Sequence, residues 1–105
     1  MEVPEIDVQE LAAQRGTNPT IIDVREDDEY AAVRVPGVVH IPLREVAERI
    51  DEVPTEGTIY VICEGGGRSA KAAAHYRALG IDAVNVAGGT RGWIDADLPT
   101  ESGAG

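Results

Sequence analysis

Residues 58–69 read TIYVICEGGGRS, and this stretch decides the fold. The run 59–62 has no polar alternation, which predicts a central parallel strand covered on both faces. The glycines that follow predict a loop, and the alanine-rich run 70–79, ended by Gly80, predicts a helix that approaches the sheet closely. A strand, a loop and a helix in direct succession are typical of an α/β fold.

Short apolar runs elsewhere in the chain predict the remaining strands. We expect strands at residues 3–6, 21–24, 38–41, 58–62 and 83–86. Because helical patterns separate most of them, the sequence predicts an α/β fold with a central, mainly parallel sheet of about five short strands flanked by helices. We expect a single domain over residues 1–100 and a flexible, small and polar tail over 101–105.

Capping signals predict where the helices begin. Asp7 and Glu10 have the spacing of a capping box, and Gly16 is expected to end the helix that they begin. The other expected starts are a charged helical turn at 25–30, Pro42 as the first residue of a helix, Ser69 as the cap of 70–79, and Thr90 as the cap of a short helix that carries Trp93.

Composition narrows the classes of function. The chain has 105 residues and a formal net charge of −10, which argues against binding to nucleic acid or to anionic membrane surfaces. The N-terminal residues lack the basic and apolar regions of a secretory signal, and no apolar run approaches the ~20 residues of a membrane span. A lone cysteine forms no intramolecular disulfide, so we expect a cytoplasmic protein.

The single cysteine, Cys63, is the candidate reactive residue. It lies at the expected carboxyl end of a parallel strand, where ligands bind in α/β folds. Glycines at 65–67 allow successive backbone N–H groups to converge, and the helix that follows adds its free first-turn donors. Such surroundings favour the thiolate, which is the nucleophile. The alternative is a small buried hydrophobic residue, but a purely structural connection does not require three glycines.

The neighbours of Cys63 have alternative roles. Arg68 either pairs with a nearby carboxylate or helps to hold an anionic substrate. Ser69 is expected to cap the helix, with donation to the sulfur as a second role. Glu64 is expected to point outward, because an inward carboxylate would raise the thiol pKa. We expect His40 and His75 to be structural, and no cluster of Cys and His predicts a metal.

Four segments, in order along nearly the whole chain, resemble the motifs of the rhodanese, or sulfurtransferase, family. They are Asp23-Val24-Arg25-Glu26 with Glu29-Tyr30, Val35-Pro36-Gly37 with His40-Ile41-Pro42, the Cys-x-x-Gly-x-Arg-Ser pattern from Cys63 to Ser69, and Val86-Ala87-Gly88-Gly89 with Trp93 and Leu98-Pro99. Any one of these segments is a weak signal, and together they are specific. Asp23 and Arg25 are expected to form charge-assisted hydrogen bonds that fix the end of their strand.

The resemblance implies a small rhodanese-type (thiosulfate) sulfurtransferase without a cofactor or a metal. In that family the loop cysteine takes a sulfane sulfur from a donor, holds it as a persulfide and passes it to an acceptor such as cyanide or a thiol. On this chain Cys63 is then the catalytic nucleophile. The substrate-binding residues that the resemblance implies are Glu64, Gly65, Gly66, Gly67, Arg68 and Ser69.

Two questions stay open at this stage. The donor is either thiosulfate or a persulfide on a small thiol or protein, because Glu64 stands where some thiosulfate-using members carry a basic or polar side chain. The alternative functions are a sulfur-relay or regulatory binding module with little small-molecule activity, and a cysteine-dependent phosphatase or arsenate reductase. The last has five residues between its cysteine and arginine, whereas four separate Cys63 from Arg68.

Overall fold

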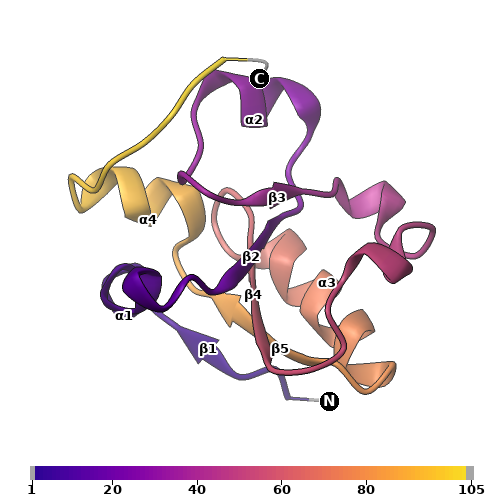
Figure 1. The fold of residues 1–105 in the computed structure, drawn as a ribbon. Helices are drawn as coiled ribbons and strands as arrows, with labels where there is room; N and C mark the ends of the chain where they lie inside the picture. The colour runs from indigo at the N-terminus through magenta and orange to yellow at the C-terminus, as the bar shows by residue number, and fades with distance from the viewer. Residues whose placement is uncertain (1, 104–105) are drawn as a thin grey trace.

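The computed structural model describes residues 2–103, and a parallel sheet of five strands lies at its centre (Figure 1). The strands are β1 (Glu5–Ile6), β2 (Thr20–Asp23), β3 (Val39–His40), β4 (Thr58–Ile62) and β5 (Asp82–Val86). Their order across the sheet is β1-β5-β4-β2-β3, and each neighbouring pair is parallel. The predicted α/β fold is therefore confirmed, with the strand that precedes Cys63 in the middle of the sheet.

Helices cover both faces of this sheet (Figure 1). Helices α1 (Val8–Gln14) and α4 (Gly89–Asp95) pack on one face, and α3 (Gly67–Ala78) packs on the other. Within β4, Ile59 and Val61 join the apolar cluster on the α3 side, whereas Tyr60 and Ile62 join the cluster that contains Leu11 and Trp93. Both faces of β4 are thus buried, which explains its continuous apolar run.

The first helix begins as predicted and ends later than predicted. The Asp7 side chain accepts a hydrogen bond from the Glu10 backbone N–H, and the reciprocal bond completes the capping box. Gly16 does not end the helical path, because a 3-10 turn, η1 (Arg15–Thr17), continues it. The left-handed residue is instead Asn18, at φ 58°, a conformation that asparagine tolerates better than most residues.

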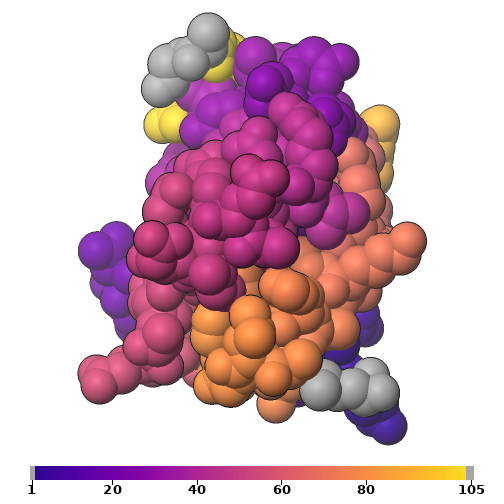
Figure 2. Space-filling model, turned by 90° about the vertical axis from the view of Figure 1, so that its right-hand side faces the viewer, coloured from indigo at the N-terminus to yellow at the C-terminus, as the bar shows by residue number. Residues whose placement is uncertain are grey.

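The prediction of a helix that begins at Pro42 is wrong. Two short 3-10 segments, η2 (Leu43–Glu45) and η3 (Ile50–Glu52), stand in its place and lie against α3, in the magenta part of Figure 2. Burial of Val46 and Val53 holds the segment against the core. Most side chains of this stretch favour a helix, so tertiary packing has overridden the local propensity.

The other helix starts also differ from the predictions. Helix α3 begins at Gly67, after the left-handed Gly66, so Ser69 lies inside its first turn and is not the cap. Thr90 is likewise inside α4, which begins at Gly89 after Gly88. The expected charged turn is present as α2 (Asp27–Ala32), beyond the carboxyl ends of the strands (Figure 1).

The C-terminal residues are attached to the body of the protein. Arg34 and Glu101 form an antiparallel bridge with two backbone hydrogen bonds of 2.9 Å, and the Gly103 N–H donates to the Ala31 carbonyl. Residues 101–103, which we expected to begin a flexible tail, therefore hold the α2 region, and residues 104–105 lie outside the described part. No helix within residues 2–103 is long and apolar enough to cross a membrane.

Candidate active site

Cys63 lies one residue beyond β4, with its sulfur enclosed by the loop that follows. The side chain is buried, and the Gly66 backbone N–H donates to Sγ across 3.1 Å. The Ser69 hydroxyl oxygen lies 3.2 Å from the same sulfur. These donors come from the loop and from the first turn of α3, whose N-terminal end carries partial positive charge. The loop therefore presents donors to one sulfur atom.

This geometry lowers the pKa of the Cys63 thiol below its usual value. Burial by itself raises the pKa, because it removes the thiolate from water. The Ser69 hydroxyl and the backbone N–H groups of Ser69, Gly66 and Gly65 act in the opposite direction and together outweigh burial. A lowered thiol pKa increases the fraction of nucleophilic thiolate.

Ser69 contacts the sulfur instead of capping the helix. Its position two residues into α3 places the buried hydroxyl between Cys63 and β5. Of the two roles considered for Ser69, the contact with the sulfur is the one that the structure contains.

Arg68 forms a bidentate ion pair with Glu29 of α2. Its two terminal nitrogens lie 2.6 Å and 2.9 Å from the two carboxylate oxygens. The hydrogen bond from Arg68 lowers the pKa of Glu29 to about 2, and the carboxylate in turn raises the pKa of Arg68. The pairing alternative for Arg68 is thus present, and it fastens the loop to α2.

The Glu64 carboxylate faces two guanidinium groups. Its carboxylate oxygens lie 3.4 Å from an Arg25 nitrogen and 3.3 Å from an Arg91 nitrogen. Arg25 is buried and also binds Asp23, with a 3.0 Å ion pair and further hydrogen bonds, and donates to the Val33 carbonyl. The expected charge-assisted bonds between Asp23 and Arg25 are therefore present, and Glu64 extends them to the loop.

Asn85 of β5 is a site residue that the sequence reasoning missed. Its side-chain oxygen lies 2.5 Å from the Ser69 hydroxyl oxygen, and its amide nitrogen lies 2.8 Å from a Glu5 carboxylate oxygen and 3.2 Å from the Gly66 carbonyl oxygen. The available signal was a single polar residue within the otherwise apolar run 83–86. A buried amide in an apolar strand requires partners, and here they belong to the cysteine loop.

The turn after β5 and the start of α4 form backbone hydrogen bonds to the first residues of the cysteine loop. The Thr90 N–H donates to the Cys63 carbonyl across 2.8 Å, and the Arg91 N–H donates to the Glu64 carbonyl across 3.0 Å. Gly89 packs so closely that a Cβ atom there would lie 2.5 Å from the Cys63 carbonyl oxygen. The backbone of α4 thus fixes the base of the loop.

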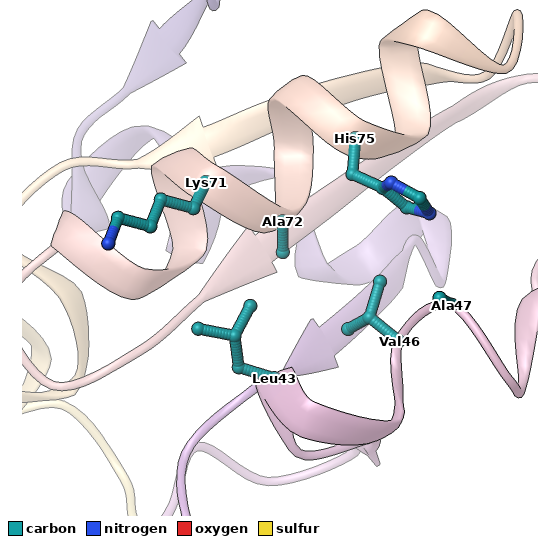
Figure 3. Close-up of a pocket in the computed structure, with 6 residues that line it drawn as sticks. All are labelled: Leu43, Val46, Ala47, Lys71, Ala72 and His75. Atoms are coloured by element: carbon teal, nitrogen blue, oxygen red, sulfur yellow. The ribbon is translucent and has the colours of Figure 1, made fainter.

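Neither histidine contacts Cys63. His40 stacks on Tyr30 with ring centroids 4.2 Å apart, and its Nε2 lies 2.8 Å from the Arg25 carbonyl oxygen. His75 lines a hollow of about 190 Å³ between α3 and the segment 43–47, to which Lys71 and Leu43 also contribute (Figure 3). No residue of the loop 63–69 lines this hollow. Within residues 2–103, no group of three or more His, Cys, Asp or Glu side chains is placed to hold a metal ion.

Comparison with known proteins places this geometry in a family. The Rhodanese-like domain matches residues 7–96. The putative sulfur carrier protein YrkF of Bacillus subtilis is 40% identical over 94 residues, and the putative sulfurtransferase YtwF of the same organism is 32% identical over 101 residues. The match covers 87% of this chain and 51% of YrkF, and 94% of this chain and 98% of YtwF. The chain therefore spans about half the length of YrkF.

A solved structure agrees with these relatives. The rhodanese-related protein of Thermoplasma volcanium superposes with a TM-score of 0.88 at 30% identity, covering 93% of this chain and 97% of that one. The chain belongs to the rhodanese-like domain family.

Proposed function

We propose that this protein is a sulfurtransferase in which Cys63 carries a sulfane sulfur as a persulfide. The observation that carries the proposal is the buried Cys63 sulfur, which accepts from the Gly66 backbone N–H and lies beside the Ser69 hydroxyl at the start of α3. The loop residues from Glu64 to Ser69 form the substrate-binding region, with their backbone N–H groups stabilising a sulfur anion. A covalent persulfide divides the transfer into two easier steps.

In the first step the Cys63 thiolate attacks the sulfane sulfur of the donor. With a persulfide donor, RS–SH, a new S–S bond forms to Cys63, the old S–S bond breaks and the donor leaves as the thiolate RS⁻. With thiosulfate, the same attack releases sulfite and leaves an anionic persulfide on Cys63. In the second step cyanide or a thiolate takes the outer sulfur, and Cys63 returns as a thiolate.

The charges around the loop favour a persulfide donor over thiosulfate. Arg68 is neutralised by Glu29, and Arg25 and Arg91 are both engaged by Glu64. A doubly charged anion therefore meets guanidinium groups that already have carboxylate partners, on a chain of net charge −10. The relative YrkF is named a putative sulfur carrier protein, which supports a relay as an alternative. A relay on a dedicated protein partner is the second candidate function.

Intact-protein mass after incubation with donor tests the proposal. The protein is treated with thiosulfate, and separately with a small-molecule persulfide, and the product is then exposed to cyanide. We expect a gain of one sulfur, about 32 Da, that cyanide removes. Because Cys63 is the only cysteine, the Cys63→Ser variant is a matched control and should gain nothing.

The two donors separate the candidate functions. Uptake from both donors with rapid release to cyanide supports a general sulfurtransferase. Uptake from the persulfide alone supports a relay carrier. Failure of both donors to modify a folded protein would contradict the persulfide mechanism.

A further inference from the structure

The Ser69 hydroxyl has two possible acceptors and one proton to donate. Its oxygen lies 2.5 Å from the Asn85 side-chain oxygen and 3.2 Å from Cys63 Sγ. A serine hydroxyl donates one hydrogen bond at a time and offers lone pairs in its other directions. The destination of this proton therefore determines what Cys63 faces, either a donor or a lone pair.

The orientation of the Asn85 amide is fixed by its other two neighbours. The amide nitrogen faces the Glu5 carboxylate at 2.8 Å and the Gly66 carbonyl at 3.2 Å, and both of these groups only accept hydrogen bonds. A reversed amide would place its oxygen against two acceptors. Asn85 is buried, so water offers no replacement. The Asn85 oxygen must therefore face Ser69 and accept from it.

We propose that Asn85 is a positioning residue that retains the Ser69 proton and so favours the forms of Cys63 in which Sγ carries no charge. In the thiol form, the S–H donates to the Ser69 oxygen while Ser69 donates to Asn85, and every group has a partner. In the persulfide form, Sγ is bonded to carbon and to the outer sulfur and is again uncharged. Both forms leave the Ser69 proton on the Asn85 side.

The thiolate is the form that this arrangement opposes. When Cys63 ionises, its proton leaves to solvent, and the Ser69 O–H must rotate from Asn85 to the sulfur anion. The Asn85 oxygen then faces a Ser69 lone pair across 2.5 Å with no hydrogen between them. The stabilisation that Ser69 gives the thiolate is therefore reduced by the loss at Asn85.

Several charged groups surround the cysteine loop. They are Arg68 of α3 with Glu29 of α2, Arg25 after β2 and Arg91 of α4 with Glu64, and Glu5 of β1 behind Asn85. Because these groups stay in place when Asn85 is shortened, a thermodynamic cycle isolates the route through Ser69. The inference deepens the proposed function, since it identifies a residue that sets when the attacking thiolate forms.

The test measures the rate of Cys63 alkylation by iodoacetamide as a function of pH in the full chain. With one cysteine, the midpoint of this profile reports the Cys63 thiol alone. We expect Asn85→Ala to lower the midpoint by about one pH unit, about tenfold in thiolate fraction at neutral pH, since Ser69 is then free to donate to the sulfur. In the Ser69→Ala background, the same change should not move the midpoint.

The control variants separate this role from a structural one. Val84→Ala shortens another buried side chain of β5, outside the cysteine loop, and should leave the midpoint unchanged. Glu5→Ala removes an exposed partner of Asn85, and it should lower the midpoint more in the original protein than in the Ser69→Ala background. This difference excludes the direct effect of the lost carboxylate charge and keeps the test available if Asn85→Ala does not fold.

Two results would overturn the inference. An equal shift in the presence and absence of Ser69 would mean that Asn85 acts through the Gly66 backbone. No shift in a folded Asn85→Ala or Glu5→Ala protein would mean that the Ser69 proton already lies on the sulfur. Alkylation requires no sulfur donor, so a failed sulfur-transfer assay leaves this test intact.

Discussion

The glycines after β4 and the glycines after β5 look alike in sequence but differ in what the structure requires of them. A Cβ atom on Gly65 or Gly67 would meet no heavy atom within 4 Å. A Cβ atom on Gly89 would lie 2.5 Å and 2.6 Å from the carbonyl oxygens of Cys63 and Glu64. The first turn is therefore open above its backbone, whereas the second is packed tightly against the first.

Gly66 shows a third requirement, which is conformational. Its φ of 111° lies where side chains are strained, yet its nearest neighbour to an added Cβ would be 3.6 Å away. The cysteine loop thus depends on one glycine for its backbone path, and its other two glycines have open space around their Cα atoms. The turn after β5 packs against the carbonyl groups of Cys63 and Glu64 and so holds this path in place.

The largest expected effect on the free energy of unfolding is at Gly89, in the turn after β5. Gly89→Ala combines a close contact with two carbonyl oxygens and a positive φ of 58°, and we expect it to lower the free energy of unfolding by about 3 kcal/mol. Urea unfolding measures the change. Gly65→Ala, with open space around its Cβ, is the matched control and should cost less than about 0.5 kcal/mol. Equal costs would remove the distinction between the two turns.

At Gly66 we expect a smaller effect on the free energy of unfolding than at Gly89, together with a change in the pKa of Cys63. Gly66→Ala should lower the free energy of unfolding by about 1–2 kcal/mol, because the left-handed backbone is strained for alanine. The displaced Gly66 N–H no longer stabilises the thiolate, so the pKa of Cys63 should rise. Alkylation as a function of pH measures this rise. A Gly66→Ala protein with an unchanged thiol pKa would show that the φ of Gly66 does not position its donor.

The sequence was sufficient for the sheet because burial on two faces leaves a clear pattern. The continuous apolar run of β4 and the capping box before α1 are local signals, and both features are present where they were predicted. The rhodanese-like family membership was likewise predicted from motifs in order along the chain. The roles of Cys63 and its loop remain predictions, supported by the sulfur contacts.

The departures come from contacts between residues distant in sequence. The segment 43–52 takes its path from packing against α3, and residues 101–103 pair with the α2 region. Asn85 was missed because its partners, Glu5 and Ser69, lie 80 and 16 residues away in sequence. Helix starts were misplaced at Ser69 and Thr90 because left-handed glycines, and not side-chain caps, begin α3 and α4.

Glu64 connects the two turns electrostatically, which gives a third prediction. Glu64→Gln removes the carboxylate that engages Arg25 and Arg91, so an anionic donor should meet less neutralised guanidinium groups. We expect the KM for thiosulfate to fall by about two- to fivefold at low ionic strength, with the benefit lost in high salt. A small persulfide with no other charged group carries less negative charge than thiosulfate, so as the control substrate it should show a smaller change. An unchanged or higher KM for thiosulfate in Glu64→Gln would mean that Glu64 acts by ordering the loop through Arg91.

The smallest expected effect concerns the opposite end of the cysteine loop, where Arg68 pairs with Glu29. The folded pKa of Glu29, about 2, lies below the ordinary value of 4.5. Its contribution to stability is therefore fully present above about pH 4.5 and is lost as the pH falls towards 2. Both side chains are partly exposed, so the contribution should stay below about 1 kcal/mol.

Urea unfolding of Glu29→Gln across this range isolates the pair. The variant should be less stable than the original protein at pH 6, and the difference should shrink towards pH 3. In an Arg68→Gln background the same substitution should have little effect at either pH, because the partner is absent. A difference that persists without Arg68 would assign it to the hydrogen bond between Glu29 and the Glu26 backbone. The close packing of Gly89 against the cysteine loop would then contribute most of the stability of the site. The ion pair between Arg68 and Glu29 would only orient Arg68.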